Sequence, residues 1–205
     1  MAQGTYDIIT VGGGLGGSTL AKVMAERGAR VLVLERERLF RDRVRGEVMV
    51  SWGVAEVQAL GIYPLMRGTC GHELPWYVQA VGPEPGVPRD LLATTPQHAP
   101  FLAFAHPVMQ EVLLQAAADA GADVRRGARA RHVQPGTVPR VEGEQDGYVE
   151  EVRARLVVGA DGRASMVRKW ADFSARHDPE RLQISGVLFE EMPTPPNRVT
   201  TDSVG

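Results

Sequence analysis

The sequence predicts an α/β protein built on a parallel β-sheet, with a smaller strand-rich part inserted into it. Three observations predict this class: a short apolar run ends at a glycine cluster, a helical pattern follows the glycines, and a second apolar run follows the helix. Parallel strands need a crossover connection between them, and a helix usually supplies it. The order strand, helix, strand therefore indicates a βαβ unit.

This βαβ unit occupies the N-terminal part of the chain. The run 6–11 is rich in β-branched residues, which predicts a buried strand. A helix is expected from about Leu15 to Arg27, because apolar residues recur at helical spacing and Gly28 supplies a C-terminal stop. The apolar run 31–34 predicts the next buried strand, which ends at Glu35.

The middle of the chain changes from helical to strand-like patterns. A second helix is expected over 46–60, after an arginine-rich loop. Prolines between 83 and 100 exclude a long helix there, and strand-like stretches over 76–81 and 101–104 flank that loop. These short strands predict the inserted part of the fold.

Regular patterns return in the next part of the chain. The clearest amphipathic helix runs over 108–120, with Pro107 as a first helical residue. A strand over 122–126 and hairpin-like segments over 129–153 are expected to follow it.

The last part begins with another buried strand, expected over 156–160. This strand runs directly into Asp161-Gly162 and a short helix. We expect one more strand over 182–190, and we expect 192–205 to be structureless because it is rich in Pro, Thr and Asn.

The composition argues against several classes of protein. The chain has 205 residues and a net charge of -2, which gives no field to attract a polyanion, so we expect no nucleic-acid partner. Its apolar runs are far shorter than the ~20 residues of a membrane helix, so we expect no membrane span. A single cysteine, Cys70, and an N-terminus without signal-peptide features favour a cytoplasmic location. No set of Cys and His residues supports a metal site.

The glycine cluster reads Gly12-x-Gly14-x-x-Gly17 and lies between an expected strand and an expected helix. In a Rossmann-like dinucleotide site, the first glycine permits a tight turn, the second lets a diphosphate approach the backbone, and the third lets helix and strand pack closely. Leu15 and Gly16 lie at the helix N-terminus, where backbone amides attract an anion. We therefore expect these five residues to bind a dinucleotide.

The acidic residue after the second strand supports the same interpretation. Glu35 is placed to accept the hydroxyls of an adenosine ribose, and its charge disfavours a 2'-phosphate. Arg36 is a further candidate, because it is placed to receive a phosphate. The glycine motif alone leaves both NAD and FAD open.

A second motif lies at 156–168, where an apolar strand is followed by Asp161-Gly162, then Ser165 and Arg168. This segment resembles the Asp-Gly fingerprint of the FAD-dependent aromatic hydroxylases, the family of p-hydroxybenzoate hydroxylase-like monooxygenases. The resemblance implies FAD as the cofactor, with Asp161 bound to the ribityl chain and Gly162 admitting the cofactor closely. Taken alone, Asp161 also fits a helix N-cap.

The resemblance implies two further cofactor contacts. Arg45, in Arg45-Gly46-Glu47, matches an arginine that lies against the flavin and its diphosphate, although a solvated arginine loop is the alternative. Gln110 stands where many relatives carry Arg, and its amide can still donate to ribityl or phosphate oxygens. No catalytic residue is identified.

The resemblance also implies a division into domains. It predicts a discontinuous FAD-binding domain over 1–71 and 105–175, and a partial substrate domain over 72–104 and 176–205. The third motif of the family, a Gly-Asp followed by small residues, is missing. We therefore expect the chain to be the N-terminal part of a longer protein, with a fold that is incomplete at the C-terminus.

The implied activity is that of an FAD-dependent oxidoreductase. A monooxygenase of this family uses NAD(P)H as a transient reductant and inserts one oxygen of dioxygen, by hydroxylation or epoxidation, through a flavin hydroperoxide. The expected substrate is a small molecule that is aromatic or polyketide- or isoprenoid-like. A flavin-dependent halogenase, an isoprenoid-type reductase and a catalytically inert nucleotide-binding fragment are the alternatives.

Overall fold

The computed structural model describes residues 6–42, 47–81, 86–179, 187, 191, 193 and 195–203. The chain forms two compact units. The first comprises Met1–Arg41 and Gln110–Gln183, and the second comprises Asp42–Met109 and Ile184–Gly205. The division between them lies inside helix α5 (His106–Asp119).

The first unit contains a six-stranded sheet with the order β8-β2-β1-β11-β10-β9. Its strands are β1 (Tyr6–Val11), β2 (Val31–Glu35), β8 (Asp123–Arg126), β9 (Arg129–Gln134), β10 (Arg140–Gln145) and β11 (Tyr148–Gly159). The strands β8, β2, β1 and β11 pair in parallel, and β9 and β10 continue the sheet as antiparallel neighbours. The predicted α/β class with a parallel sheet is confirmed.

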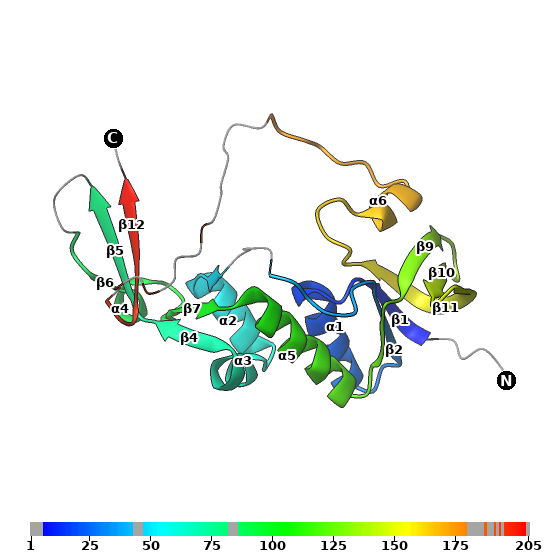
Figure 1. Ribbon diagram of the computed structural model, residues 1–205, viewed down its shortest axis with the longest axis horizontal. Helices are drawn as coiled ribbons and strands as arrows, with labels where there is room; N and C mark the ends of the chain where they lie inside the picture. The colour runs from blue at the N-terminus through cyan, green and yellow to red at the C-terminus, as the bar shows by residue number, and fades with distance from the viewer. Residues whose placement is uncertain are drawn as a thin grey trace. The chain divides into compact units, whose positions relative to one another are not determined.

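The parallel strands are covered on both faces, as Figure 1 shows for the labelled elements of this unit. On one face, α1 (Leu15–Glu26) and α5 contribute Ala21, Leu114 and Ala117 to a core that includes Ile8. On the other face, residues of β9, β10 and β11 pack against β1 and β2 in a second core. All five residues of β2 are buried. Burial on both faces explains why the first four, 31–34, form a continuous apolar run before Glu35.

The strand β11 has two partners along its length. Its first half pairs with β10 in an antiparallel ladder, and its second half pairs with β1 in parallel, with Val11 opposite Gly159. The strand expected over 156–160 is therefore the end of a 12-residue strand. It is not buried as expected, because this half of β11 pairs with β1 on one side only, and Leu156 is 52% exposed. The N-terminal half of β11, which pairs with β10, is polar, so the sequence shows no continuous apolar run that would reveal the whole strand.

The second unit contains two three-stranded sheets, with the orders β3-β7-β4 and β12-β5-β6. Its elements are β3 (Val48–Met49), α2 (Ser51–Ala59), α3 (Tyr63–Thr69), β4 (Gly71–Leu74), β5 (Trp76–Val81), β6 (Arg89–Asp90), α4 (Leu91–Thr94), β7 (Phe101–Phe104) and β12 (Arg198–Ser203). The rings of Tyr77 on β5 and Phe101 on β7 lie 6.1 Å apart between centroids and connect the two sheets. The expected strands over 76–81 and 101–104 are present.

Three expectations differ from the structure. The helix expected over 46–60 begins only at Ser51, because Val48 and Met49 pair with β7 instead. The short helix α3 was not expected, although Pro64 near its start suits a first helical turn. The segment 192–205 is not structureless, because β12 pairs in parallel with β5. The strand expected over 182–190 lies outside the described residues, apart from Val187.

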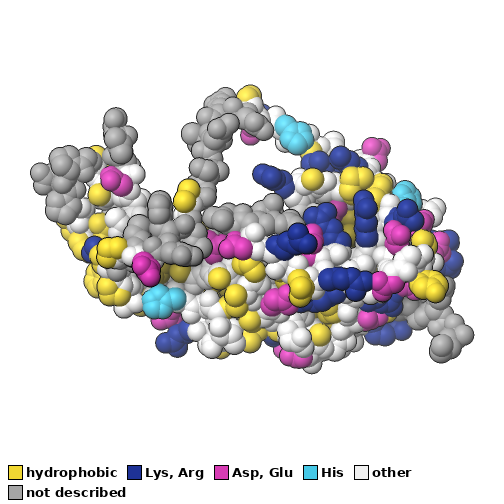
Figure 2. Space-filling view, in the orientation of Figure 1, with side chains coloured by type: hydrophobic (Ala, Val, Ile, Leu, Met, Phe, Trp, Pro, Cys, Tyr) yellow, Lys and Arg dark blue, Asp and Glu magenta, His cyan; other side chains and the backbone are white. Residues whose placement is uncertain are grey.

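Charged side chains of both signs are interspersed on the surface of the first unit, as the face drawn in Figure 2 shows. No helix within the described ranges is long and apolar enough to cross a membrane. Across the same ranges, no group of three His, Cys, Asp or Glu side chains is arranged to hold a metal ion.

Candidate functional site

The glycine turn between β1 and α1 lies beside the end of β11. Gly12 has φ +103°, and a Cβ on it would lie 2.4 Å from the carbonyl oxygen of Ala160. A Cβ on Gly17 would lie 1.9 Å from the carbonyl oxygen of Gly12. The protein itself therefore requires glycine at both positions, first for the left-handed turn against β11 and then for the close packing of α1 on that turn.

Gly14 and Gly16 differ from these two glycines. Gly14 has φ -72° and ψ -170°, an extended conformation open to any residue. The nearest atom to a Cβ placed on Gly14 would be Nε2 of Gln110, at 3.9 Å, and a Cβ on Gly16 would meet nothing within 4 Å. Packing within the chain thus requires no glycine at either position. A ligand that approaches the backbone at this turn would require it.

The N-terminus of α1 offers donors to such a ligand. Gly14 is the N-cap residue and makes no side-chain cap, and the first helical bond runs from the amide of Ser18 to the carbonyl of Gly14 at 2.9 Å. The amides of the first turn, which includes Leu15, have no intrahelical partner. Together with the helix dipole they favour a negative group beside Gly14.

Glu35 connects this turn to the end of β2. It is buried, with 6% of its surface exposed. Its Oε2 accepts the amide of Gly13 at 2.7 Å, and its Oε1 accepts the amide of Glu37 at 2.7 Å. Each carboxylate oxygen retains a second lone pair, so Glu35 can hold the turn and still accept a hydroxyl group.

Asp161 lies next to the same turn, because the amide of Ala160 donates to the carbonyl of Val11 at 2.8 Å. Its Oδ1 accepts the Ser165 hydroxyl at 2.5 Å, and its Oδ2 accepts the amides of Met166 and Val167 at 2.6 and 3.1 Å. The N-cap residue of α6 (Met166–Trp170) is Ser165, whose hydroxyl accepts the Arg168 amide at 3.1 Å, and Asp161 accepts two further amides of the first turn. The alternative that Asp161 is itself the N-cap is therefore wrong in its residue, although Asp161 does bind the start of the helix, and its carboxylate retains acceptor capacity.

The other expected site residues are placed in different ways. Gly162 has φ +85°, and a Cβ on it would meet nothing within 4 Å. Gln110 projects from α5 toward Gly14. The Arg36 side chain is 67% exposed and lies 3.4 Å from Glu37 between Nε and Oε1, so the structure does not bring it to the turn. Arg45 lies outside the described residues.

Two residues that the sequence did not single out complete the turn. The buried hydroxyl of Ser18 donates to the carbonyl of Gly13 at 2.7 Å. A Cβ on Gly13 would lie 3.1 Å from both Glu35 Cβ and Leu114 Cδ1. The only signal in the sequence for the Ser18 hydrogen bond was a small polar residue directly after Gly17. Nothing in the spacing indicated that Gly13 packs closely against Glu35 and Leu114.

The donors and acceptors at this edge suit a nucleotide. Backbone amides of α1 and the Gln110 amide are donors for a diphosphate, and the carboxylates of Glu35 and Asp161 are acceptors for sugar hydroxyls. The open space at Gly14 lies on the helix side of the turn, beside Gln110. The residues present therefore fit a nucleotide bound by its diphosphate.

Comparison with known proteins agrees with this chemistry. The family described as "FAD binding domain" matches residues 5–202. The chain is 32% identical to 6-methylpretetramide 4-monooxygenase from Streptomyces rimosus, over 96% of this chain and 48% of that protein. It is 33% identical to rifampicin monooxygenase from Streptomyces venezuelae, over 87% of this chain and 36% of that protein. It is 29% identical to digeranylgeranylglycerophospholipid reductase 2 from Methanococcoides burtonii, over 87% of this chain and 43% of that protein.

A solved structure supports the fold. The crystal structure of p-nitrophenol 4-monooxygenase from Pseudomonas putida superposes with a TM-score of 0.72, over 82% of this chain and 43% of that chain, at 21% identity. At this identity the similarity shows a shared architecture. The chain spans less than half the length of each of these relatives.

Proposed function

The chain belongs to the FAD-binding-domain family, and from this premise we propose that it holds FAD at the edge where β1, β2 and β11 end. The amides of the first turn of α1 bind the diphosphate, and Glu35 accepts hydroxyls of the adenosine ribose. Asp161 and Gln110 bind the ribityl chain or the phosphate oxygens, and Gly162 leaves room for the cofactor. When bound, FAD supplies the redox chemistry.

One observation supports this proposal most strongly, and it is the open space at Gly14. A glycine costs roughly 0.5–1 kcal/mol relative to alanine inside a helix or strand, because its backbone loses more conformational freedom on folding. Gly12 and Gly17 offset that cost by allowing contacts with the chain that a Cβ would block. Gly16, inside α1, has no such compensation within the protein, and Gly14 is the N-cap, where a capping side chain such as Ser or Asp would serve the helix at least as well. A diphosphate against the backbone would account for the missing side chain at both positions.

Two more expected contacts belong to this proposal on weaker grounds. Arg36 is next to Glu35 in the chain and carries an exposed guanidinium that can reach a phosphate from solvent. Arg45 matches the family arginine in sequence alone. We propose a discontinuous FAD-binding domain over 1–71 and 105–175, and a partial substrate domain over 72–104 and 176–205.

The wider activity that we propose is monooxygenation by a longer protein that contains this chain. The two Streptomyces relatives named as monooxygenases support it. On this proposal NAD(P)H is the reductant, the substrate is a small aromatic or polyketide-like molecule, and the location is cytoplasmic. The reductase relative favours a second candidate, reduction of an isoprenoid-like alkene.

Isotope labelling distinguishes the two candidate activities. Aromatic polyketides and isoprenoid alkenes are incubated with the protein, FAD, NAD(P)H and ¹⁸O₂, and the products are analysed by mass spectrometry. A monooxygenase adds one ¹⁸O atom to its product, whereas a reductase adds two hydrogens and no label.

Binding of FAD is tested separately, by titration followed through the quenching of flavin fluorescence. The wild-type chain is expected to bind FAD, and Gly14→Val is expected to lose that binding while it keeps its circular dichroism spectrum. Gly68→Val is the matched control, because a Cβ on Gly68 meets nothing within 4 Å, much as a Cβ on Gly14 would meet only Gln110 Nε2, at 3.9 Å. Equal binding by Gly14→Val and the wild type would show that the turn serves packing only.

A further inference from the structure

The side chain of Arg126 joins two elements of the proposed FAD site. Arg126 is the last residue of β8 and lies opposite Glu35 in the parallel ladder with β2. Its Nη1 donates to Glu111 Oε1 at 3.0 Å, and its Nη2 bonds the other oxygen of the same carboxylate. The Nη1 group also donates to the carbonyl of Arg38 at 3.1 Å, and the guanidinium lies 5.0 Å from the centre of the Phe40 ring.

The partners of Arg126 lie on two elements next to the proposed FAD site, namely α5 and the loop after Glu35. Glu111 directly follows Gln110 on α5, and Gln110 is the residue nearest to the open space at Gly14. Arg38 and Phe40 belong to the loop that leaves Glu35. One guanidinium therefore fixes the rotation of α5 and the path of this loop at the same edge of the sheet.

Arginine suits this role because its guanidinium is a planar fork. It matches the carboxylate of Glu111 with two parallel bonds, and it can stack on the Phe40 ring at the same time. Lysine would retain the charge as a single point without the fixed geometry.

The contribution of this ion pair to folding is small. The side chain of Arg126 is 28% exposed and that of Glu111 is 44% exposed, so solvent screens their attraction. A small effect on stability combined with a fixed geometry is typical of a residue that orients its neighbours. Residues that orient the ligands of a metal site typically lower its affinity about 10- to 100-fold when they are mutated, and we expect an effect in the same direction here.

We propose that Arg126 is a positioning residue of the cofactor site, which acts through Glu111 on Gln110 and through Arg38 and Phe40 on the loop after Glu35. This inference rests on the proposed binding of FAD. Removal of the guanidinium would leave the fold in place and let α5 and the loop take several arrangements, so that FAD must order them on binding.

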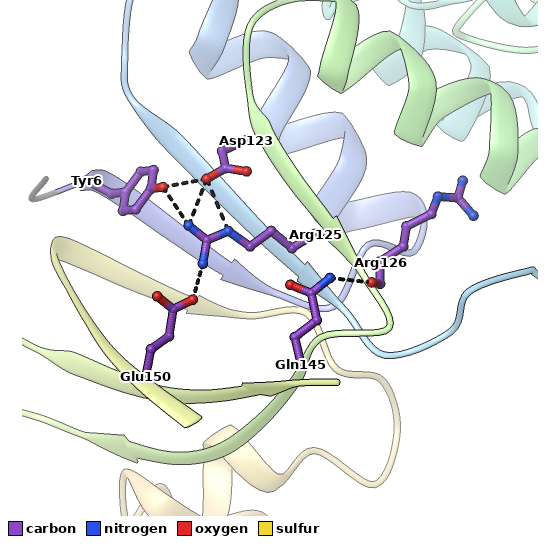
Figure 3. Close-up of polar contacts among 6 residues, drawn as sticks. All are labelled: Tyr6, Asp123, Arg125, Arg126, Gln145 and Glu150. Carbon is purple, nitrogen blue, oxygen red and sulfur yellow. Dashed lines mark hydrogen bonds and ion pairs between the residues drawn. The ribbon is translucent and has the colours of Figure 1, made fainter. Parts of the chain in front are cut away.

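The neighbouring residue provides a matched control. Arg125 precedes Arg126 on β8, so its side chain points to the opposite face of the sheet. It donates from Nη2 to the Tyr6 hydroxyl at 3.2 Å and to Asp123 Oδ2 at 3.0 Å, and it pairs with Glu150 on β11. Figure 3 shows these partners together, with the Arg126 side chain directed away from them. Arg125 is 24% exposed, close to the value for Arg126.

The test compares Arg126→Met, Arg126→Lys and Arg125→Met in the full 205-residue chain. FAD affinity is measured by flavin fluorescence titration, and urea unfolding is measured without FAD. We expect Arg126→Met to bind FAD about tenfold more weakly, which is the lower end of the range for residues that orient metal ligands. Arg126→Lys should recover part of the loss, and Arg125→Met should stay within about twofold of the wild type. The unfolding midpoints of Arg126→Met and Arg125→Met should agree.

Several outcomes would overturn the inference. If Arg126→Met binds FAD as tightly as the wild type, or if Arg125→Met weakens binding equally, Arg126 is not a positioning residue, and the FAD site itself still stands. If Glu111→Gln adds its full effect on affinity to that of Arg126→Met, Arg126 does not act through Glu111. A wild-type chain that binds no FAD would remove the proposed function, and this inference with it.

Discussion

Gly14 and Gly17 lack a side chain for different physical reasons. At Gly17 an added methyl group would overlap the carbonyl oxygen of Gly12 at 1.9 Å, so the close packing of α1 on β1 depends on this glycine. At Gly14 an added methyl group finds open space beside Gln110. Gly17 therefore serves the fold, and we assign Gly14 to the ligand.

These two glycines should respond differently to alanine. Gly17→Ala forces the turn and α1 apart and should lower the free energy of unfolding by about 3 kcal/mol, as overpacking of a tight interior does. Gly14→Ala should change it by no more than about 0.5 kcal/mol, as surface substitutions do. Urea unfolding without FAD measures both values. Equal losses for the two variants would contradict the separation of roles.

Glu35 has a structural duty beside its proposed contact with the ribose. Glu35→Gln replaces one carboxylate oxygen by an NH₂ group, which cannot accept a hydrogen bond. The remaining oxygen can accept the backbone amide of Gly13 or that of Glu37, but not both in the present geometry. One buried backbone amide then lacks its partner, which should cost about 1–3 kcal/mol of unfolding free energy. Glu26→Gln, at an exposed helix position paired with Lys22, is the control and should cost less than about 0.5 kcal/mol. Similar unfolding curves for Glu35→Gln and the wild type would refute this duty.

At the scale of elements, a tyrosine joins α3 to β4. The Tyr63 hydroxyl donates to Glu73 Oε1, and Arg67 Nε lies 2.9 Å from the same oxygen. Burial, together with the hydrogen bond to Glu73 and the negative charge of that residue, raises the pKa of Tyr63 to about 12. The neutral phenol is therefore the form that the folded protein favours.

This elevated pKa predicts a dependence of stability on pH. Since the folded pKa lies above the ordinary value of 10.0, the native state retains a proton that the unfolded chain loses. The contribution of Tyr63 is fully present below pH 10.0 and is lost as the pH rises toward about 12. Urea unfolding should show a steeper loss of stability in this range for the wild type than for Tyr63→Phe. Tyr148→Phe, at an 82% exposed position, should behave like the wild type.

Elements with a local signal could be predicted from the sequence, and those that depend on distant pairing could not. The unit β1-α1-β2 follows from apolar runs and glycines within a short stretch, and its boundaries agree with the prediction to within one residue. The strand β12 lies in a Pro-rich segment and forms only because β5, far away in the chain, offers an edge. Local composition favoured a loop there.

Across the whole molecule, parallel pairing brings the two motifs together. The strands β1 and β11 run side by side, so the glycine turn and Asp161 follow the same edge of the sheet although most of the chain separates them. The sequence predicted this meeting, because the carboxyl ends of parallel strands share an edge. It could not predict the bond from Gly13 to Glu35, the Ser165 cap of α6 with its bond to Asp161, or the paired bonds of Arg126. These contacts depend on side-chain directions that only the packed structure defines.

The most direct measurement compares the affinities of the wild-type chain for FAD and for riboflavin, which lacks the diphosphate and the adenosine. If the N-terminus of α1 holds the diphosphate beside Gly14, FAD should bind at least about 100-fold more tightly than riboflavin, which is about 2.7 kcal/mol. In Gly14→Val this preference should fall below about tenfold. Equal affinities for the two flavins in the wild type, or an unchanged preference in Gly14→Val, would contradict a diphosphate site at this turn.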